Sequence, residues 1–279
     1  MRVRDVLRRS GLEVHLAPTS APGHATALAA GAVNAKAGLI IAMGGDGTVN
    51  EVLNGMAHSS VPLAVIPGGT ANVFCCETGI PRNPEKAAAL LPEWVEARVA
   101  LGRVQCAGEA PRYFLSMAGA GLDGGIVQRV QPALKRRLGK VAYWIAGFRA
   151  FGESLSILHA QAEGRQLATG FALTSRVRNY GGDLTIASKA SLFTDQFELV
   201  TFSGRSTIPY LIYLSGAVFG LATSLPGVHS VLTRRVDLAS SNGRPVYIQV
   251  DGEAAGQLPV SIEIVSSALT VLVPKNAIR

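Results

Sequence analysis

Two short, uninterrupted apolar runs stand out in the first quarter of the chain, and each one ends in a glycine-rich turn. Residues 39–43 form the first run and residues 63–66 form the second. Runs of this length that are closed by glycines are typical of strands buried on both faces of a sheet. Apolar residues return at helical spacing over residues 48–56, and a second helix is expected from Thr70 onward.

The flanking residues extend this alternation of strands and helices. Residues 3–9 have helical spacing with Gly11 as a stop signal, and residues 12–16 alternate like a strand. The alanine-rich residues 23–36 predict a helix. Alternating strands and helices indicate a parallel sheet with helices on both faces, in which ligands bind beyond the carboxyl ends of the strands.

The pattern changes after the first third of the chain to short β-branched and alternating runs between glycine-rich turns. These runs predict a mostly antiparallel β domain, and they cover residues 113–117, 171–175, 184–187, 197–202, 246–250, 261–265 and 269–273. Two apolar helical insertions interrupt them, near residues 134–151 and 208–222. We therefore expect a doubly wound, parallel-sheet α/β domain over residues 1–97, to which the tail 274–279 returns, and a β-sandwich domain over residues 98–273.

The composition sets limits on this picture. A chain of 279 residues suits two unequal domains. Hydrophobic residues make up 48% and charged residues 16%, so much apolar surface is either buried or offered to a partner. The net charge of +7 suits a nucleic acid, an anionic membrane surface or a polyphosphate substrate equally well. The three cysteines form no spaced framework for disulfides or a metal.

The hydropathy pattern predicts neither a signal peptide nor a membrane-spanning helix. The basic N-terminus is followed by no apolar run of signal-peptide length. The longest uncharged stretch, residues 206–233, contains serine, threonine, glycine, Pro226 and His229, which suit a lipid-exposed helix poorly. We expect a cytoplasmic protein.

The first glycine-rich turn, Gly44-Gly45-Asp46-Gly47-Thr48, lies between a predicted strand and a predicted helix. Glycines let the backbone approach a bulky anion, and the N–H groups at the start of a helix favour phosphate. The turn lacks both the Gly-Lys-Ser/Thr of a Walker A loop and the spacing of a dinucleotide fingerprint. Asp46 would repel phosphate unless a cation intervened, so it either holds Mg²⁺ or caps the helix.

The second turn, Gly68-Gly69-Thr70-Ala71-Asn72, follows the next predicted strand. The carboxyl ends of neighbouring parallel strands meet at one edge of the sheet, so both turns should face the same crevice. A single glycine-rich turn after a strand is a weak signal, whereas two in succession are a much stronger one.

The chain resembles the catalytic domain of diacylglycerol kinases and the bacterial lipid kinases related to them, a family that includes sphingosine and ceramide kinases. The resemblance covers the first turn and residues 49–55 nearly residue for residue, and the second turn as well. Thr19 and residues 23–25 resemble an upstream element whose threonine contacts nucleotide in relatives. The resemblance implies that ATP is bound by Thr19, Gly44, Gly45, Asp46, Gly47, Thr48, Val49, Asn50, Gly69, Thr70 and Asn72.

A weaker resemblance in the C-terminal half concerns a structural metal. Residues 179–182 and 192–197 resemble the stretch that holds a structural Mg²⁺ in bacterial relatives. The chain departs from that stretch at Gln196, where relatives carry the glycine of an Asp-Gly pair. The resemblance implies that the metal is held by Leu192, Asp195 and Phe197.

Asp251-Gly252-Glu253 resembles the C-terminal acidic motif to which proton acceptance is assigned in the family. The resemblance implies that Glu253 is the catalytic base, that Asp251 supports it and that Asp46 helps to place the catalytic metal. On its own, an Asp-Gly-Glu sequence in a β domain is an ordinary solvated hairpin turn.

Two further departures from the family lie in the N-terminal half. Relatives begin with a strand that ends in Asn-Pro-x-Ser-Gly, and this chain starts after it, so we expect the first strand of the parallel sheet to be missing. Val73 stands where relatives commonly carry an acid. The departures bear on activity rather than on ancestry.

We expect an ATP-dependent lipid kinase that uses Mg²⁺ to move the γ-phosphate of ATP to a lipid hydroxyl, that of diacylglycerol or a related lipid. The product is then of the phosphatidate type. The order of basic and then aromatic residues suits peripheral association with an anionic membrane, or equally an ordinary helix with a solvated basic end; these residues are Lys135, Arg136, Arg137, Lys140, Tyr143, Trp144, Ile145 and Phe148.

Several alternatives stay open beside the lipid kinase. An NAD kinase would share the first glycine turn and the two-domain layout, although the Asp251 motif favours the lipid branch. A catalytically impaired relative that binds lipid or nucleotide is a second alternative. The sequence also leaves open whether the protein forms a homodimer. No aromatic-basic strand motif supports a nucleic-acid partner.

Overall fold

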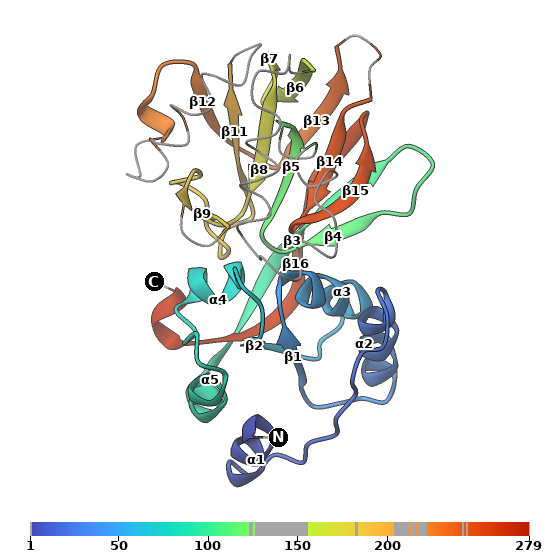
Figure 1. The fold of residues 1–279 in the computed structure, drawn as a ribbon, viewed down its shortest axis with the longest axis vertical. Coiled ribbons are helices and arrows are strands. Elements are labelled where there is room, and N and C mark those ends of the chain that lie inside the picture. Colours follow the sequence, from blue (N-terminus) through green and yellow to red (C-terminus); the bar gives the residue numbers. More distant parts are fainter. Residues whose placement is uncertain are drawn as a thin grey trace.

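The computed structural model describes residues 2–122, 125, 156–181, 184–203, 213, 216, 222–241, 243 and 245–278. A small α/β layer lies at one end of the molecule and two β sheets form the other (Figure 1). The predicted helical insertion 134–151, with its basic and aromatic residues, and most of the insertion 208–222 lie outside the described residues. No helix within the described part of the chain is long and apolar enough to cross a membrane.

The α/β layer is built on two parallel strands, β1 (Ile40–Gly44) and β2 (Leu63–Pro67). Every residue of β2 is buried, as expected for a continuous apolar run between two layers of helices. Helices α3 (Asp46–Met56), α4 (Val73–Thr78) and α5 (Pro84–Leu90) pack on these strands, and the short 3₁₀ helix η1 (Leu91–Glu93) follows α5. Helix α2 (His24–Asn34) packs on α3, and α1 (Arg2–Arg9) packs on α5. The predicted alternation of strands and helices is confirmed.

Three details of this layer differ from the prediction. Helix α3 begins two residues earlier than expected, at Asp46, and α4 begins three residues later, at Val73. The strand expected over residues 12–16 is wrong, because these residues form no strand. Their alternation arises because Leu12 and Val14 pack against the core from an irregular segment.

Two long antiparallel strands, β3 (Val95–Cys106) and β16 (Val260–Val273), run through both parts of the molecule (Figure 1). One end of β16 pairs with β2 and the other with β13, which gives a sheet of order β1-β2-β16-β13-β6-β7. The runs 261–265 and 269–273, predicted as two strands, are one strand with an irregularity between Val265 and Leu269.

A second, antiparallel sheet of order β12-β11-β8-β5-β14-β15 completes the sandwich. Its inner side packs on the first sheet through residues such as Phe114 and Phe197, whose rings stack with centroids 5.7 Å apart. The remaining strands are β4 (Arg112–Phe114), β5 (Met117–Gly121), β6 (Leu158–Ala162), β7 (Arg165–Thr169), β8 (Phe171–Ser175), β9 (Asn179–Tyr180), β10 (Leu184–Thr185), β11 (Phe197–Phe202), β12 (Val228–Thr233), β13 (Arg235–Ser240), β14 (Tyr247–Val250) and β15 (Glu253–Gln257).

The predicted fold class, a parallel-sheet α/β domain followed by a β sandwich, is confirmed. The predicted strands at 171–175 and 197–202 coincide with β8 and β11. The expected boundary between residues 97 and 98 lies inside β3, so the two domains share their longest strands. The 3₁₀ helix η3 (Lys275–Ile278) at the end of the chain lies against α4.

Helices α2 and α3 cross at very short distance around Gly55. A Cβ atom on Gly55 would lie 2.2 Å from the carbonyl oxygen of Thr26 and 2.9 Å from Cβ of Ala29. The hydroxyl of Thr26 also donates to the carbonyl oxygen of Glu51, over 2.9 Å. The glycine is therefore needed for packing of the helix that begins at the first turn.

We predict that Gly55→Ala lowers the free energy of unfolding by about 1–3 kcal/mol, because the added methyl group forces the two helices apart. The matched control is Gly31→Ala in α2, where a Cβ atom meets nothing within 4 Å. Since alanine favours helix more than glycine does, the control should leave stability unchanged or raise it by up to about 1 kcal/mol. Urea unfolding measures both, and equal effects would contradict the close crossing.

Candidate active site

The two glycine-rich turns interlock at the carboxyl ends of β1 and β2. The N–H of Gly68 donates to the carbonyl oxygen of Gly44 over 2.9 Å. A Cβ atom on Gly69 would lie 2.5 Å from Cα of Gly45, and one on Gly68 would lie 3.1 Å from Cα of Gly44. Contact between the turns therefore requires glycine at these positions, whether or not a phosphate binds there.

The second turn is closed by Asn72. Its backbone has a left-handed φ of 49°, a conformation that asparagine tolerates better than most residues. The Asn72 side chain accepts from the N–H of Gly69 over 2.9 Å and donates to the carbonyl oxygen of Gly69 over 2.8 Å. This double hydrogen bond holds the turn in shape, while Gly69 and Thr70 stay exposed.

Asp46 lies in the first turn of α3 but caps the neighbouring helix. Its Oδ1 accepts the backbone N–H of Val73, the first residue of α4, over 2.7 Å. Val73 thus contributes its backbone N–H to this contact, which does not depend on the acidic side chain that relatives commonly carry at this position. Of the two roles expected for Asp46, capping is present, but on α4 instead of its own helix.

The electrostatic surroundings of Asp46 favour a cation. Burial raises the pKa of its carboxyl and the nearby Asp251 carboxylate raises it further, while the hydrogen bond from Val73 lowers it. Burial also raises the pKa of the neighbouring Cys75 thiol to about 12, with a further contribution from Asp46. A positive ion here would lower the free energy of both carboxylates, and a single carboxylate is the kind of protein ligand that Mg²⁺ shares with substrate phosphates, so Asp46 fits such an ion.

Two asparagines of α3 join this helix to the β domain. Asn50 donates to the carbonyl oxygen of Tyr113 over 3.0 Å and to Oδ2 of Asp251 over 2.9 Å. Asn54, one turn later, donates to the same Tyr113 carbonyl oxygen and accepts from the Tyr113 N–H. Arg112 completes the group through two donor nitrogens on Oδ1 of Asn50, at 3.1 and 2.8 Å.

Glu51, which lies between these asparagines in the sequence, points toward the start of α2 and not toward the β domain. Its two carboxylate oxygens accept the backbone N–H groups of Gly23 and Ala25, over 2.8 and 3.1 Å. Glu51 thereby fixes the start of α2 and the end of the loop that contains Thr19. Thr19 itself is exposed in that loop.

Asp251 is held by four hydrogen-bond donors. Its carboxylate accepts the side chain of Asn50 and the consecutive backbone N–H groups of Leu115, Ser116 and Met117, over 2.9–3.1 Å. Burial raises the pKa of Asp251, and these hydrogen bonds act in the opposite direction. They also divide the predicted strand 113–117 into β4 and β5, since three consecutive residues of it turn their N–H groups to the carboxylate.

Asp251 and Gly252 form the tight turn of the β14–β15 hairpin. Their φ values of 47° and 82°, with Val250 paired to Glu253, match a two-residue type I′ turn, for which Asp-Gly is a favoured sequence. The turn delivers Glu253 to the start of α3, where its Oε1 would lie 2.9 Å from a Cβ atom on Gly47. The structure thus brings together Asp46, Gly47, Asn50, Asp251 and Glu253.

Several other predicted site residues are buried, packed against the backbone or paired with another side chain. Val49 is buried in the core, and the side chain of Thr48 packs against Gly44. Leu192 and Phe197 are buried in the β domain, and Asp195 forms an ion pair with Arg234 at 4.0 Å. The described residues contain no cluster of three or more His, Cys, Asp or Glu that could hold a metal ion.

The sequence analysis did not single out Arg112 or Tyr113. Arg112 acts through Asn50 and also donates to the carbonyl oxygen of Ala254, next to Glu253, over 3.3 Å. Tyr113 acts mainly through its backbone, for which a sequence carries no signal. Arg112 lies 62 residues away from Asn50 along the chain, so only the fold relates the two.

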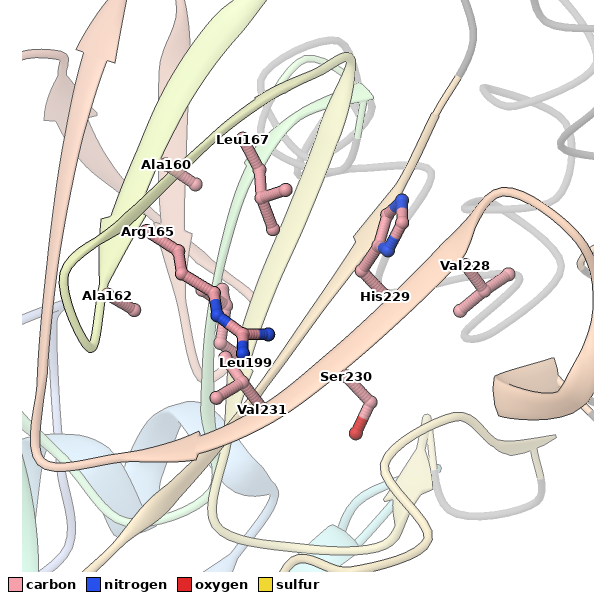
Figure 2. Close-up of a pocket in the computed structure, with 9 residues that line it drawn as sticks. All are labelled: Ala160, Ala162, Arg165, Leu167, Leu199, Val228, His229, Ser230 and Val231. Atoms are coloured by element: carbon pink, nitrogen blue, oxygen red, sulfur yellow. The ribbon is translucent and has the colours of Figure 1, made fainter.

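A separate cavity of about 300 Å³ opens in the β sandwich (Figure 2). Arg165, His229 and Ser230 line it together with apolar side chains that include Leu167 and Leu199. Its walls come from β6, β7, β11 and β12. None of these strands carries a residue of the glycine turns or of the Asp251 hairpin.

Comparison with known proteins agrees with this architecture. A model of the diacylglycerol kinase catalytic domain matches residues 1–104, and a model of the YegS C-terminal NAD kinase beta sandwich-like domain matches residues 116–273. A curated diacylglycerol kinase from Bacillus subtilis is 29% identical over 282 residues, which cover 99% of this chain and 90% of that protein. One from Staphylococcus saprophyticus is 26% identical, over 97% and 88% of the two chains.

The solved structures give the same result for the fold. A crystal structure of a putative diacylglycerol kinase from Bacillus anthracis superposes with a TM-score of 0.81 at 22% identity, covering 99% of this chain and 91% of that one. The second family model alone covers more than half of this chain. The chain therefore belongs to the family that these two models define, with a diacylglycerol kinase catalytic domain over residues 1–104 and a YegS C-terminal NAD kinase beta sandwich-like domain over residues 116–273.

Proposed function

We propose that this protein is an ATP-dependent lipid kinase that transfers the γ-phosphate of ATP to the hydroxyl of diacylglycerol or a related lipid, giving a phosphatidate-type product. The observation that supports it most directly is the position of Glu253, whose carboxylate rests on Gly47 in the first turn of α3. A proton acceptor thus lies beside the glycine turns at the carboxyl ends of the parallel strands. The names of the curated relatives favour the same activity.

In this proposal the phosphates of ATP lie over the second turn and the N-terminus of α3. The first N–H groups of a helix have no partners within the helix, and its dipole favours negative charge there. The second turn is exposed and held in shape by Asn72. The proposed nucleotide-binding residues are Thr19, Gly44, Gly45, Asp46, Gly47, Thr48, Val49, Asn50, Gly69, Thr70 and Asn72.

Asp46 is the residue proposed to hold Mg²⁺ with the nucleotide. Its carboxylate stays anchored by the N–H of Val73 and gains from a cation because Asp251 is near. When bound, Mg²⁺ neutralises charge on the phosphoryl oxygens. The chain itself contributes the fixed position of the carboxylate.

Glu253 accepts the proton of the lipid hydroxyl as that hydroxyl attacks the γ-phosphorus, and ADP leaves as the bond between the γ-phosphorus and the β–γ bridging oxygen breaks. The protein does little covalent work in such a reaction, so catalysis depends on how well the groups are placed. Asp251 is a positioning residue, since its four hydrogen bonds fix the turn that carries Glu253. Asn50 fixes the same turn relative to α3.

The acceptor is proposed to come from a membrane surface. A net charge of +7 favours attraction to anionic lipids, and the segment from Lys135 to Phe148 is the proposed contact. ATP and the lipid then meet at the cytoplasmic face of a membrane, with the protein bound peripherally.

The proposed activity is tested with radiolabelled ATP and vesicles that contain diacylglycerol, phosphatidylglycerol, a sphingoid base or a polyprenol, with NAD as a soluble acceptor. We expect Mg²⁺-dependent transfer of label to one lipid. Labelling of NAD instead would support an NAD kinase-like enzyme. No transfer to any acceptor, with the protein folded, would support a catalytically impaired relative.

We predict that Glu253→Gln lowers turnover by roughly 10²–10⁴-fold, the usual contribution of a positioned base, and leaves the affinity for ATP nearly unchanged. Glu96→Gln is the matched control, because Glu96 is exposed on β3 and pairs with Leu272, away from the hairpin. Steady-state kinetics and calorimetry with ATP measure the two quantities. Lost affinity with preserved turnover would show that Glu253 has only a structural role.

We predict that Asp46→Asn removes most Mg²⁺-dependent activity without lowering the melting temperature. Folding raises the pKa of this carboxyl, so its stabilising contribution exists below the unfolded pKa and is lost as the pH rises through the folded pKa. At pH 7 the amide therefore costs the fold no more than the carboxylate does, and its oxygen can still accept from Val73. Asp5→Asn in α1 is the control, because Asp5 is half-exposed and its ion pair is with the adjacent Arg4, and near-normal turnover of Asp46→Asn would refute the assignment.

A further inference from the structure

Among the residues that the structure describes, Arg176, which follows β8 directly, is the largest side chain that is completely buried. A charged side chain is seldom buried unless it is paired and hydrogen-bonded, because the loss of hydration costs several kcal/mol. Sequence patterns gave no reason to single it out. The groups that contact this guanidinium must therefore account for its burial.

The guanidinium spans two carbonyl oxygens of a single turn. Its Nη2 donates to the carbonyl oxygen of Leu192 over 2.5 Å, and its Nη1 donates to that of Thr194 over 3.1 Å. Residue 192 lies in the turn before β11, which is also closed by the hydroxyl of Thr194 on the carbonyl oxygen of Ser191, at 3.2 Å. The planar fork of arginine suits two acceptors at this spacing.

The counter-charge comes from the same turn. Burial lowers the pKa of Arg176 to about 10, and the nearby Asp195 carboxylate acts against that lowering. An arginine side chain is positive at neutral pH in any case. Asp195 is half-exposed and faces a second arginine, Arg234, on its outer side at 4.0 Å.

These contacts involve the residues to which the family resemblance assigns a structural Mg²⁺. A carbonyl oxygen and a carboxylate are suitable ligands for Mg²⁺, but here the Leu192 carbonyl already accepts from a fixed positive charge. A divalent ion on the same oxygen would lie within a few ångströms of the guanidinium, in a place where little water screens the repulsion. The residues present therefore do not fit the ion.

We propose that the Arg176 side chain takes the place of the structural divalent cation in this chain, holding the turn at residues 191–196 by hydrogen bonds and charge. The departure at Gln196 from the Asp-Gly pair of relatives agrees with a site that no longer needs metal geometry. The inference does not depend on which substrate the protein phosphorylates.

The segment that contains Arg176 also links this turn to the α/β layer. Two residues after Arg176, Arg178 forms an ion pair with Glu77 of α4 at 2.9 Å, and its backbone N–H donates to the other Glu77 oxygen over 3.1 Å. One short segment thus fixes the turn through Arg176 and α4 through Arg178. Both links are made by protein side chains.

The stability test uses Arg176→Met, which keeps the length of the side chain and removes its donors. Two buried carbonyl groups then lose their partners, so we predict a melting temperature lower by about 5–10 °C. Arg234→Met, which removes the exposed arginine beside the same Asp195, should change it by less than about 2 °C. An unchanged melting temperature in Arg176→Met would overturn the proposal.

The metal test needs no destabilised variant, so it holds even if Arg176→Met fails to fold. The melting temperature of the wild-type chain is measured in EDTA and in a Mg²⁺ titration without nucleotide, in parallel with Asp195→Asn. We predict either no response, or a response that Asp195→Asn retains because it arises at another site. A saturable rise in the wild type that Asp195→Asn abolishes would show that a cation occupies this turn, and would overturn the proposal.

Discussion

The hydrogen bond from the Asn50 side chain to the Asp251 carboxylate joins the two halves of the site. Asn50 belongs to the helix that starts at the first glycine turn, and Asp251 belongs to the hairpin that carries Glu253. Three consecutive backbone N–H groups hold the other side of the same carboxylate. The distance between Glu253 and the helix start is therefore set by buried amide groups, together with Arg112, which bridges Asn50 and the Ala254 carbonyl.

The glycines of the two turns meet two demands at once. They let β1 and β2 end in turns that touch each other, since a Cβ atom on Gly69 would lie only 2.5 Å from Cα of Gly45. The same absence of side chains leaves N–H groups accessible at the end of the sheet. A glycine pattern of this kind signals close backbone packing first, and a phosphate site only when the fold places a helix start beside it.

Sequence reasoning reached the parts of the structure that depend on local patterns. The continuous apolar runs predicted β1 and β2, and the alternating runs predicted most of the sandwich. Residues 12–16 were misread because half-buried side chains in an irregular segment alternate as they do in a strand. The cap that Asp46 provides for α4 and the burial of Arg176 could not be predicted, since each depends on a contact between segments distant in the chain.

The shared strands β3 and β16 decide how the molecule can deform. A pair of domains joined by flexible linkers can rotate about them, but here a continuous antiparallel ladder connects the α/β layer to the sandwich. Its pairing is interrupted between Val265 and Leu269, where Ser267 has a left-handed φ of 50°. At this irregularity the ladder lacks paired residues, so it is the point at which the ribbon resists bending least.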